Sequence, residues 1–418
     1  MNTAFLTRWV SVKPNEIKVL LWAWLYVFAL FLAYYTLRPL RDELGVSGGV
    51  KNLPWLFTGT LVAMLILSPC YAYLVKRWQR EKFIAIAYRF FMSNLLIFAG
   101  LMYFAEGDLL LWSGRIFFIW VSVFNLFVVS VFWSLMADVF NTEQGKRLFG
   151  FLATGSTLGG IAGSAFVSSV AKSLNSYVLL LIAFLLLEFA VQAAKRISRL
   201  GSQEVQKNNN AEAKIGGSLL EGLKRTFQSP YLLGISAFIL CYSVTSTILY
   251  FQQAEIVSQH FTDRGERTAF FANIDLWVNS LTLIFQVGLT GRIMKRLGIL
   301  PVLALLPLLS IFSFAALALS PTVIIFVIIQ VARRVSNFAF TRPAREVLFT
   351  RLNREDRYKA KNVIDTVIYR SGDQLGSWGY AALNAMSLGL STIAWLAVPL
   401  SFLWFILSIW LAKQENPK

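Results

Sequence analysis

The sequence predicts an all-α polytopic membrane protein with twelve transmembrane helices arranged as two six-helix bundles. Of its 418 residues, 56% are hydrophobic and only 15% are charged, whereas soluble domains carry roughly 45–50% apolar and about 25% charged residues. Such a chain cannot cover a water-facing surface, which excludes a soluble enzyme. Long apolar runs also recur along the chain, and a bilayer core of about 30 Å needs roughly 20 apolar residues per helix.

Apolar runs bounded by charged or turn residues give the predicted spans. The first run is followed by the segment 38–41 (RPLR) rather than by a small-residue cleavage site, so we interpret it as a span and not as a signal peptide. Cys70 and Cys241 both fall inside spans, which argues against disulfides and thiolate metal sites. The predicted spans are 17–37, 53–75, 83–104, 109–138, 149–172, 177–194, 231–254, 269–290, 299–319, 321–346, 362–387 and 390–412.

The cations predict how the chain is oriented. With the N-terminus in the cytoplasm, twenty-six of the 39 lysines and arginines lie in cytoplasmic segments and six in outer segments, as the positive-inside rule requires. We therefore predict cytoplasmic N- and C-termini, in a bacterial inner (plasma) membrane. The predicted domains are an N-terminal six-helix half (1–194), a cytoplasmic linker (195–230) whose composition suits an amphipathic surface helix, and a C-terminal six-helix half (231–418).

Internal repetition supports two related halves. In each half an acid at the end of a span, Asp138 or Glu346, is followed by a basic loop and then by a glycine-rich span. Glycines on one helical face allow close approach of neighbouring helices. Ordinary packing and a sliding interface between the halves both remain open as explanations. The glycines concerned are Gly155, Gly159 and Gly163 in the fifth span, and Gly372, Gly376 and Gly379 in the eleventh.

Charged and amide side chains within or near the spans are the candidates for binding. An Arg or Asp near the bilayer centre costs roughly 2.5–3.5 kcal/mol on insertion scales, so such residues face a cavity or a partner. The arginine fork binds carboxylates and phosphates bidentately. Along the tenth span, Gln330, Arg334 and Asn337 share a helical face. The predicted substrate-binding residues are Arg38, Arg41, Arg115, Asn125, Gln252, Gln253, Arg333, Arg334, Asn337 and Arg370.

A second set is predicted to act in coupling or gating. The alternative role for the intramembrane arginines is to pair with these acids and so lock the halves in one of two alternating states. For Arg370 and Asp373, one turn apart, an internal pair is at least as well supported as a ligand contact. The predicted coupling or gating residues are Asp138, Asp275, Arg345, Glu346, Asp365 and Asp373.

Three motifs, in order along most of the chain, resemble those of one family. They are the segments 35–44 (YTLRPLRDEL), 132–149, with its Phe-Trp pair before an acid, and 342–365, which ends in Lys-Ala-Lys-Asn-Val-Ile-Asp. They resemble the ATP/ADP translocase (nucleotide exchange transporter) family within the major facilitator superfamily. The resemblance implies the major facilitator fold, with spans one, four, seven and ten lining a central cavity.

Individual residues take the places of family positions in this resemblance. Arg41 occupies the place of a lysine tied to transport, Asp138 that of an acid in the fourth span, and Arg345 with Glu346 that of a Lys-Glu pair. In the seventh span the family carries an acid and a lysine, whereas this chain has Gln252 and Gln253. This departure predicts a divergent relative whose cavity favours an anionic solute, with nucleotide as one candidate.

These observations predict a secondary active transporter that moves an organic anion, nucleotide-like or phosphorylated, by alternating access. One alternative is a proton-coupled transporter of a bulky amphiphile such as a peptide, siderophore or muropeptide. Another is a non-transporting membrane assembly factor or scramblase. The chain has no Walker sequence, HExxH helix or nucleophile elbow, so no enzyme activity and no cofactor are expected. The expected partners are the lipid bilayer and a small anionic solute, with protons as a candidate coupling ion, no nucleic acid, and a monomeric state.

Overall fold

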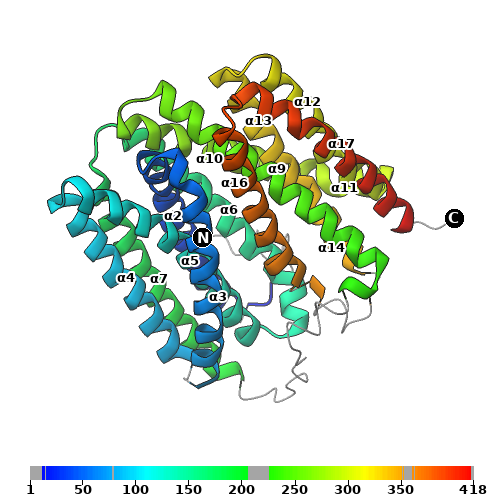
Figure 1. The fold of residues 1–418 in the computed structure, drawn as a ribbon. Coiled ribbons are helices and arrows are strands. Elements are labelled where there is room, and N and C mark those ends of the chain that lie inside the picture. Colours follow the sequence, from blue (N-terminus) through cyan, green and yellow to red (C-terminus); the bar gives the residue numbers. More distant parts are fainter. Residues whose placement is uncertain are drawn as a thin grey trace. The chain divides into compact units, whose positions relative to one another are not determined.

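The computed structural model describes residues 12–14, 16–77, 80–205, 226–350, 352, 360–361 and 363–415 (Figure 1). In this part of the chain every regular element is helical, and eleven helices are long and apolar enough to cross a membrane. The predicted all-α membrane fold is therefore confirmed.

Six long helices follow the first six predicted spans closely. The first, α2, continues past its predicted end at 37, since Pro39 lies inside the helix and does not end it. Helix α6 begins where Asn141 and Gln144 form a reciprocal capping box. The elements are α2 (Ile17–Ser47), η1 (Val50–Asn52), α3 (Leu53–Arg77), α4 (Arg80–Phe104), α5 (Gly107–Val139), α6 (Thr142–Val170) and α7 (Ser176–Val205).

The second set of helices differs in that three of them contain wide π turns, which are the elements η2, η3 and η4. The eleventh predicted span corresponds to η4 and α16, a segment rich in polar and small residues that is not among the eleven apolar helices. The elements are α9 (Pro230–His260), α10 (Arg264–Phe285), η2 (Gln286–Thr290), α11 (Gly291–Leu297), α12 (Ile299–Leu319), α13 (Val323–Ser336), η3 (Asn337–Thr341), α14 (Arg342–Thr350), η4 (Ile364–Ile368), α16 (Tyr369–Ala385) and α17 (Leu390–Glu415).

The predicted linker, 195–230, is described only at its two ends. Its first residues continue α7 to Val205, and residues 226–228 are helical just before α9. Residues 206–225, where most of the predicted amphipathic segment falls, lie outside the described residues.

Five of the six predicted glycines pack helices together within each half of the sequence, whereas a Cβ added at Gly379 would meet nothing within 4 Å. A Cβ added at Gly159 of α6 would lie 2.4 Å from the Phe28 carbonyl oxygen of α2. One added at Gly376 of α16 would lie 2.8 Å from Cβ of Thr247 on α9. Backbones this close exclude any side chain. Of the two explanations for these glycines, the observed contacts support packing of α2 with α6 and of α9 with α16.

The chain forms two compact units. The first contains Met1–Gly49, Gly59–Ala211 and Phe261–Leu276, and the second contains Val50–Thr58, Glu212–His260 and Trp277–Lys418. Each unit thus takes up one short segment from the other predicted half, namely Phe261–Leu276 in the first unit and Val50–Thr58 in the second. The division into 1–194, 195–230 and 231–418 stays a prediction.

Candidate functional site

Arg333 is a buried cation near the end of α13, in the interior of the tenth predicted span, with 4% exposure. Its Nε donates to Oγ of Ser310 on α12 at 2.9 Å, and its Nη2 donates to Oγ1 of Thr245 on α9 at 3.1 Å. Its guanidinium also lies 5.2 Å from the centroid of the Phe314 ring. Among the described residues, no carboxylate comes within ion-pair distance of Arg333, so neutral groups alone hold its charge.

Two further side-chain hydrogen bonds join the same helical face to α9. Gln330 Nε2 donates to Gln253 Oε1 at 2.6 Å, and Asn337 Nδ2 donates to the Tyr242 hydroxyl at 2.8 Å. Gln330, Gln253 and Asn337 are each buried. Polar pairs of this kind stabilise contacts between transmembrane helices. The structure therefore brings together Gln253, Arg333 and Asn337 from the predicted binding set.

The neighbouring members of that set lie elsewhere. Gln252 is 2% exposed, and its Nε2 donates to the carbonyl oxygen of Leu390, the first residue of α17, at 3.1 Å. This hydrogen bond ties α9 to α17 and turns Gln252 away from Gln253. Arg334 is half-buried on α13.

Arg370 and Asp373 form the internal pair that was one of the two predicted arrangements. Arg370 Nη1 lies 3.0 Å from Asp373 Oδ2, one helical turn away on α16. The other carboxylate oxygen accepts hydrogen bonds from Ser243 at 2.6 Å and Thr247 at 3.3 Å, both on α9. Asp373 is 7% exposed. This buried acid therefore has a cation and two hydroxyl donors around it.

Two of the π turns are joined by side chains of η2. Gln286 Nε2 donates to the Phe338 carbonyl oxygen at 3.0 Å, and Thr290 Oγ1 donates to the Ala339 carbonyl oxygen at 2.8 Å. A π turn widens the helix and displaces the backbone hydrogen bonds, and such turns are frequent at functional sites. Here η3 begins at Asn337, a predicted site residue, so the polar face of α13 ends at a distorted segment.

The arginines at the end of α2 both have acidic neighbours. Arg38 Nη1 lies 3.2 Å from Asp275 Oδ1 of α10. Arg41 Nη2 lies 3.1 Å from Asp42 Oδ1, and its guanidinium stands 4.5 Å from the centroid of the Phe118 ring. For Arg38, the structure therefore shows the pairing with an acid that was the predicted alternative to substrate contact.

Helix α5 carries three predicted residues with different surroundings. Arg115 Nη2 donates to the Gly48 carbonyl oxygen at 3.4 Å, and its guanidinium lies 4.7 Å from the Trp112 ring centroid. Its Nε is buried without a hydrogen-bond partner, and none of the described carboxylates lies within ion-pair distance. Asn125 is half-buried further along the helix, and Asp138 is exposed near its end.

The remaining coupling candidates pair at the end of α14. Arg345 Nη2 lies 3.1 Å from Asp365 Oδ1 of η4. Glu346 pairs with Lys361, which precedes η4, and lies 3.7 Å from the Arg345 guanidinium. These contacts join the tenth and eleventh predicted spans.

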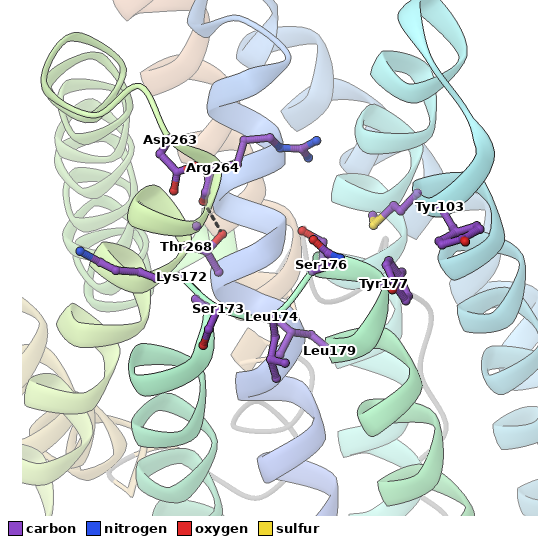
Figure 2. Close-up of a pocket in the computed structure, with 14 residues that line it drawn as sticks. Tyr103, Lys172, Ser173, Leu174, Ser176, Tyr177, Leu179, Asp263, Arg264 and Thr268 are labelled. Carbon is purple, nitrogen blue, oxygen red and sulfur yellow. Dashed lines mark hydrogen bonds between the residues drawn. The ribbon is translucent and has the colours of Figure 1, made fainter.

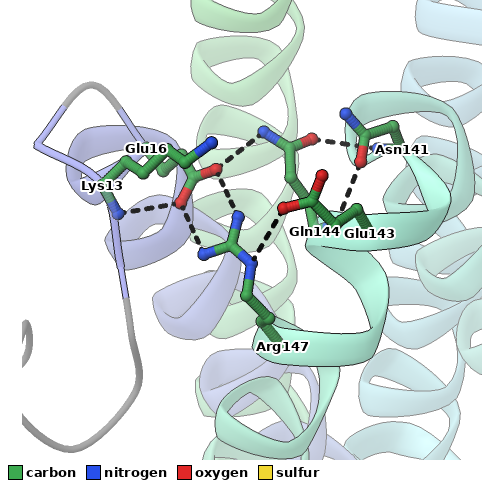
Figure 3. Close-up of polar contacts among 6 residues, drawn as sticks. All are labelled: Lys13, Glu16, Asn141, Glu143, Gln144 and Arg147. Atoms are coloured by element: carbon green, nitrogen blue, oxygen red, sulfur yellow. Dashed lines mark hydrogen bonds and ion pairs between the residues drawn. The ribbon is translucent and has the colours of Figure 1, made fainter.

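A network not predicted from the sequence surrounds Glu16, just before α2 (Figure 3). Its carboxylate accepts hydrogen bonds from the Lys13 backbone N–H at 3.0 Å, Gln144 Nε2 at 2.9 Å and Arg147 Nη2 at 3.0 Å. Burial opposes the charged form, but these hydrogen bonds and the Arg147 charge outweigh it and lower the pKa of Glu16. Glu16 precedes the first apolar run, so no helical periodicity identified it.

A cavity of about 470 Å³ lies in the first unit beside the loop between α6 and α7 (Figure 2). Tyr103 and Tyr177 stand on one side of it, and the Lys172 side chain points away from them. Lys172 pairs with Glu266 at 3.3 Å. Arg264 also lines the cavity, whereas none of the predicted site residues does.

Comparison with known proteins agrees with the fold and the motifs. The family model described as Major Facilitator Superfamily matches residues 19–344. ADP,ATP carrier protein 1 of Chlamydia trachomatis serovar D is 21% identical, with 97% of this chain and 89% of that protein covered. ADP,ATP carrier protein 2 of Chlamydia pneumoniae is also 21% identical, with 93% and 88% covered. The predicted resemblance to the ATP/ADP translocase family is thereby confirmed.

Solved structures show the same fold at low sequence identity. A bacterial homologue of the human lysosomal transporter Spinster aligns with a TM-score of 0.63 and 13% identity, over 97% of this chain and 100% of that chain. The nucleoside transporter NupG aligns with a TM-score of 0.60 and 14% identity, over 97% and 100%. The chain is thus an integral membrane protein that belongs to the Major Facilitator Superfamily of transporters, as a divergent relative of the ADP,ATP carrier proteins.

Proposed function

We propose that the protein is a secondary active transporter that moves an organic anion across a bacterial inner membrane by alternating access, as a monomer with both termini in the cytoplasm. The observation that carries this proposal is Arg333. This residue is 4% exposed inside a predicted span, and in the described residues only neutral groups hold its guanidinium. A buried cation of this kind calls for an anionic partner.

Two other arginines within or next to predicted spans provide the comparison. Arg38 and Arg370 each have a carboxylate at 3.0–3.2 Å, so their charges are balanced within the protein. Ser310 and Thr245 satisfy donors of Arg333 and fix the plane of its fork, but hydroxyl groups do not neutralise a charge. Arg333 is therefore able to attract a substrate anion. Arg115 resembles it in that no carboxylate of the described residues lies within ion-pair distance.

A nucleotide is the first substrate class to test. The relatives that match almost the whole chain are named ADP,ATP carrier proteins. The amide side chain of Gln253 on α9 bonds to Gln330 of α13, the helix that also carries Arg333. Amides suit the hydrogen-bonding edges of a base or sugar, and a guanidinium suits phosphate oxygens.

The test is uptake into proteoliposomes that contain the purified protein and an internal pool of unlabelled anion. Labelled ATP, ADP, phosphate and a sugar phosphate are offered separately to the wild type, Arg333→Gln, Arg333→Lys and Ser310→Ala. We expect uptake of at least one anion, loss of about tenfold or more in Arg333→Gln, and partial retention in Arg333→Lys, which keeps the charge but not the fork. Ser310→Ala keeps the charge and loses one hydrogen bond, so its uptake is close to wild type.

Two results would contradict the proposal. One is uptake of a neutral or cationic solute with no response to any of the four anions. The other is anion uptake that is the same in Arg333→Gln and wild type, because the buried charge would then have no role in transport.

A second candidate, proton-coupled transport, is favoured by Asp373. Asp373 is 7% exposed and its carboxylate pairs with Arg370, so protonation would release that arginine. Under this mechanism an imposed pH gradient drives uptake. Asp373→Asn would abolish the response of uptake to the pH gradient and keep exchange between internal and external substrate. If uptake by the wild type does not respond to the pH gradient, the result supports exchange without proton coupling.

A further inference from the structure

The cavity of about 470 Å³ beside the loop between α6 and α7 contains no residue of the proposed transport site. Its volume falls in the usual range for small-molecule pockets, about 300–1,000 Å³. Every residue that lines it belongs to the first unit, and nine of the fourteen are polar. It lies where α4 and α6 end and where α7 and α10 begin, which is the predicted outer side of the membrane. At this level of a bilayer the neighbouring molecules are lipid headgroups.

The charged side chains of this cavity differ in whether their charges are already balanced. Arg264 donates from Nε and Nη2 to Glu43, each at 3.2 Å, and Lys172 pairs with Glu266 at 3.3 Å. Asp263 accepts the Glu266 backbone N–H at 2.8 Å, and no cation of the described residues lies within ion-pair distance of it. In the part of the chain that the structure describes, Nη1 of Arg264 has no acceptor. The cavity therefore combines an unbalanced acid with an unused guanidinium donor.

This combination favours a ligand that carries both signs of charge. A purely anionic group could bind Nη1 of Arg264, but it would lie beside the like charge of Asp263, which is unfavourable. A group with a phosphate and an ammonium suits both residues. Phosphate oxygens accept from a guanidinium, and an ammonium donates to a carboxylate.

The order of the side chains across the cavity matches the order of groups in a phospholipid. In Figure 2 the Arg264 side chain stands between Asp263 on one side and Tyr103 and Tyr177 on the other. The two tyrosine rings contact each other, with centroids 5.1 Å apart. A tyrosine has an apolar ring and a polar hydroxyl, so it suits the boundary between headgroups and acyl chains. The lining thus offers partners for an ammonium, a phosphate and then the glycerol region.

Exposed apolar side chains continue from the tyrosines along both helices. On α7, Leu181 and Leu185 follow Tyr177 at intervals of four residues, which places all three on one helical face. These two leucines are 40% and 66% exposed, and on α4 Ile97 and Phe104 are 60% and 81% exposed. In a bilayer such an apolar surface lies against acyl chains. A lipid whose headgroup occupies the cavity would therefore have a surface for its chains.

We propose that this cavity binds the headgroup of a zwitterionic phospholipid of the ethanolamine type from the predicted outer leaflet. The phosphate accepts from Nη1 of Arg264, the ammonium donates to Asp263, and the acyl chains follow Tyr177 along α7. The bound lipid would hold the loop between α6 and α7 against the beginning of α10, within the first unit. It is a resident of this site and not the transported solute.

The test measures binding of single lipids to the purified full chain in detergent by native mass spectrometry. Phosphatidylethanolamine and phosphatidylglycerol with the same acyl chains are titrated separately, and soluble glycerophosphoethanolamine is added as a competitor. Asp263→Asn removes the charge and keeps an oxygen for the Glu266 backbone N–H. Tyr177→Ala removes the ring, and Tyr177→Phe keeps it. Lys172→Gln is the matched control, because Lys172 lines the same cavity but points away from the tyrosines.

We expect the wild type to bind phosphatidylethanolamine about threefold or more tightly than phosphatidylglycerol, as suits one exposed ion pair. Asp263→Asn removes this preference. Tyr177→Ala weakens binding of both lipids, whereas Tyr177→Phe and Lys172→Gln bind like the wild type. A phosphatidylethanolamine with a photoreactive group in its acyl chain labels the α7 peptide that contains Leu181 and Leu185, and Tyr177→Ala reduces this label.

Other results overturn the proposal. Equal affinity of the wild type for the two lipids excludes the zwitterionic headgroup. Wild-type affinity for phosphatidylethanolamine in both Asp263→Asn and Tyr177→Ala places the bound lipid elsewhere. Displacement of the lipid by an equal concentration of glycerophosphoethanolamine identifies a soluble ligand instead. An effect of Lys172→Gln equal to that of Asp263→Asn excludes the assigned partners. Monodisperse elution in detergent confirms that each variant is folded. Since no transported solute is present, failure of the proposed anion transport does not affect this result.

Discussion

Arg38, Arg333 and Arg370 carry the same guanidinium within or next to predicted spans and meet different partners. Arg38 faces Asp275 of another helix, Arg370 faces Asp373 on its own helix, and Arg333 faces neutral oxygens. Helical periodicity indicated which face each arginine occupies. Periodicity could not show which helix packs on that face. The packing helix decides whether a carboxylate neutralises the arginine or whether its charge still needs an anion.

Glu16 gives a pH-dependent prediction outside the spans. Its pKa in the folded chain lies below the ordinary value of 4.5, so the charged carboxylate stabilises the fold above about pH 4.5 and this stabilisation is lost as the pH falls through the lowered pKa. Glu16→Gln should lower the free energy of unfolding by about 1.5–3 kcal/mol at pH 7, the usual range for hydrogen bonds to a charged group. Thermal unfolding in detergent at pH 7 and below pH 4 measures both effects.

The matched control for this prediction is Glu143→Gln. Glu143 also lies near Arg147, at 3.7 Å, but its side chain is 76% exposed. We expect it to change stability little at any pH. A melting temperature of Glu16→Gln equal to that of wild type at pH 7 would show that the Glu16 network contributes nothing to stability.

Two glycines of helix α6 have different surroundings. Gly159 approaches the α2 backbone, whereas a Cβ added at Gly150 would meet nothing within 4 Å. Gly159→Ala should therefore lower the free energy of unfolding by about 1–3 kcal/mol through overpacking. Gly150→Ala should leave it unchanged or raise it slightly, since alanine favours the helix. Equal melting temperatures for the two variants would contradict the close α2–α6 contact.

The helices themselves were largely predictable, and their ends and distortions were not. Apolar runs of the required length located the spans, including 17–37, which continues to Ser47 as α2. The π turns carry no comparable signal. In η2, the hydroxyl of Thr290 bonds the Ala339 carbonyl of η3, a contact between segments far apart in the sequence. A distortion that depends on a neighbouring helix is invisible in either segment alone.

Each compact unit takes up a short segment from the other predicted half, and this gives a prediction for the whole chain. Neither sequence half contains its complete compact unit, because Phe261–Leu276 joins the first unit and Val50–Thr58 joins the second. Expressed alone, 1–210 would lack the partners of Arg38 and Glu43. We expect each half to be degraded or to aggregate alone, and the co-expressed halves to co-purify. Affinity purification through a tag on one half measures this. Stable, monodisperse single halves would be the contrary result.

The candidate site was predictable only in part. Helical spacing predicted a face with Gln330, Arg334 and Asn337, whereas the structure places Gln330, Asn337 and the adjacent Arg333 against α9. Gln252 was assigned to the same site from its neighbour Gln253, but its side chain reaches Leu390 instead. Adjacent residues on a helix point about 100° apart, so proximity in sequence does not place two side chains in one site.

The membrane class, the number and place of the spans and the family motifs follow from the sequence, because apolar length and local spacing are properties of each segment. The partners of the buried charges follow only from the tertiary structure. Glu43 and Arg264 lie far apart in the sequence and on segments of opposite halves, yet they form a bidentate pair. The reason is physical: a charge in a low-dielectric interior is stable only beside a suitable partner, and packing decides which partner comes within reach.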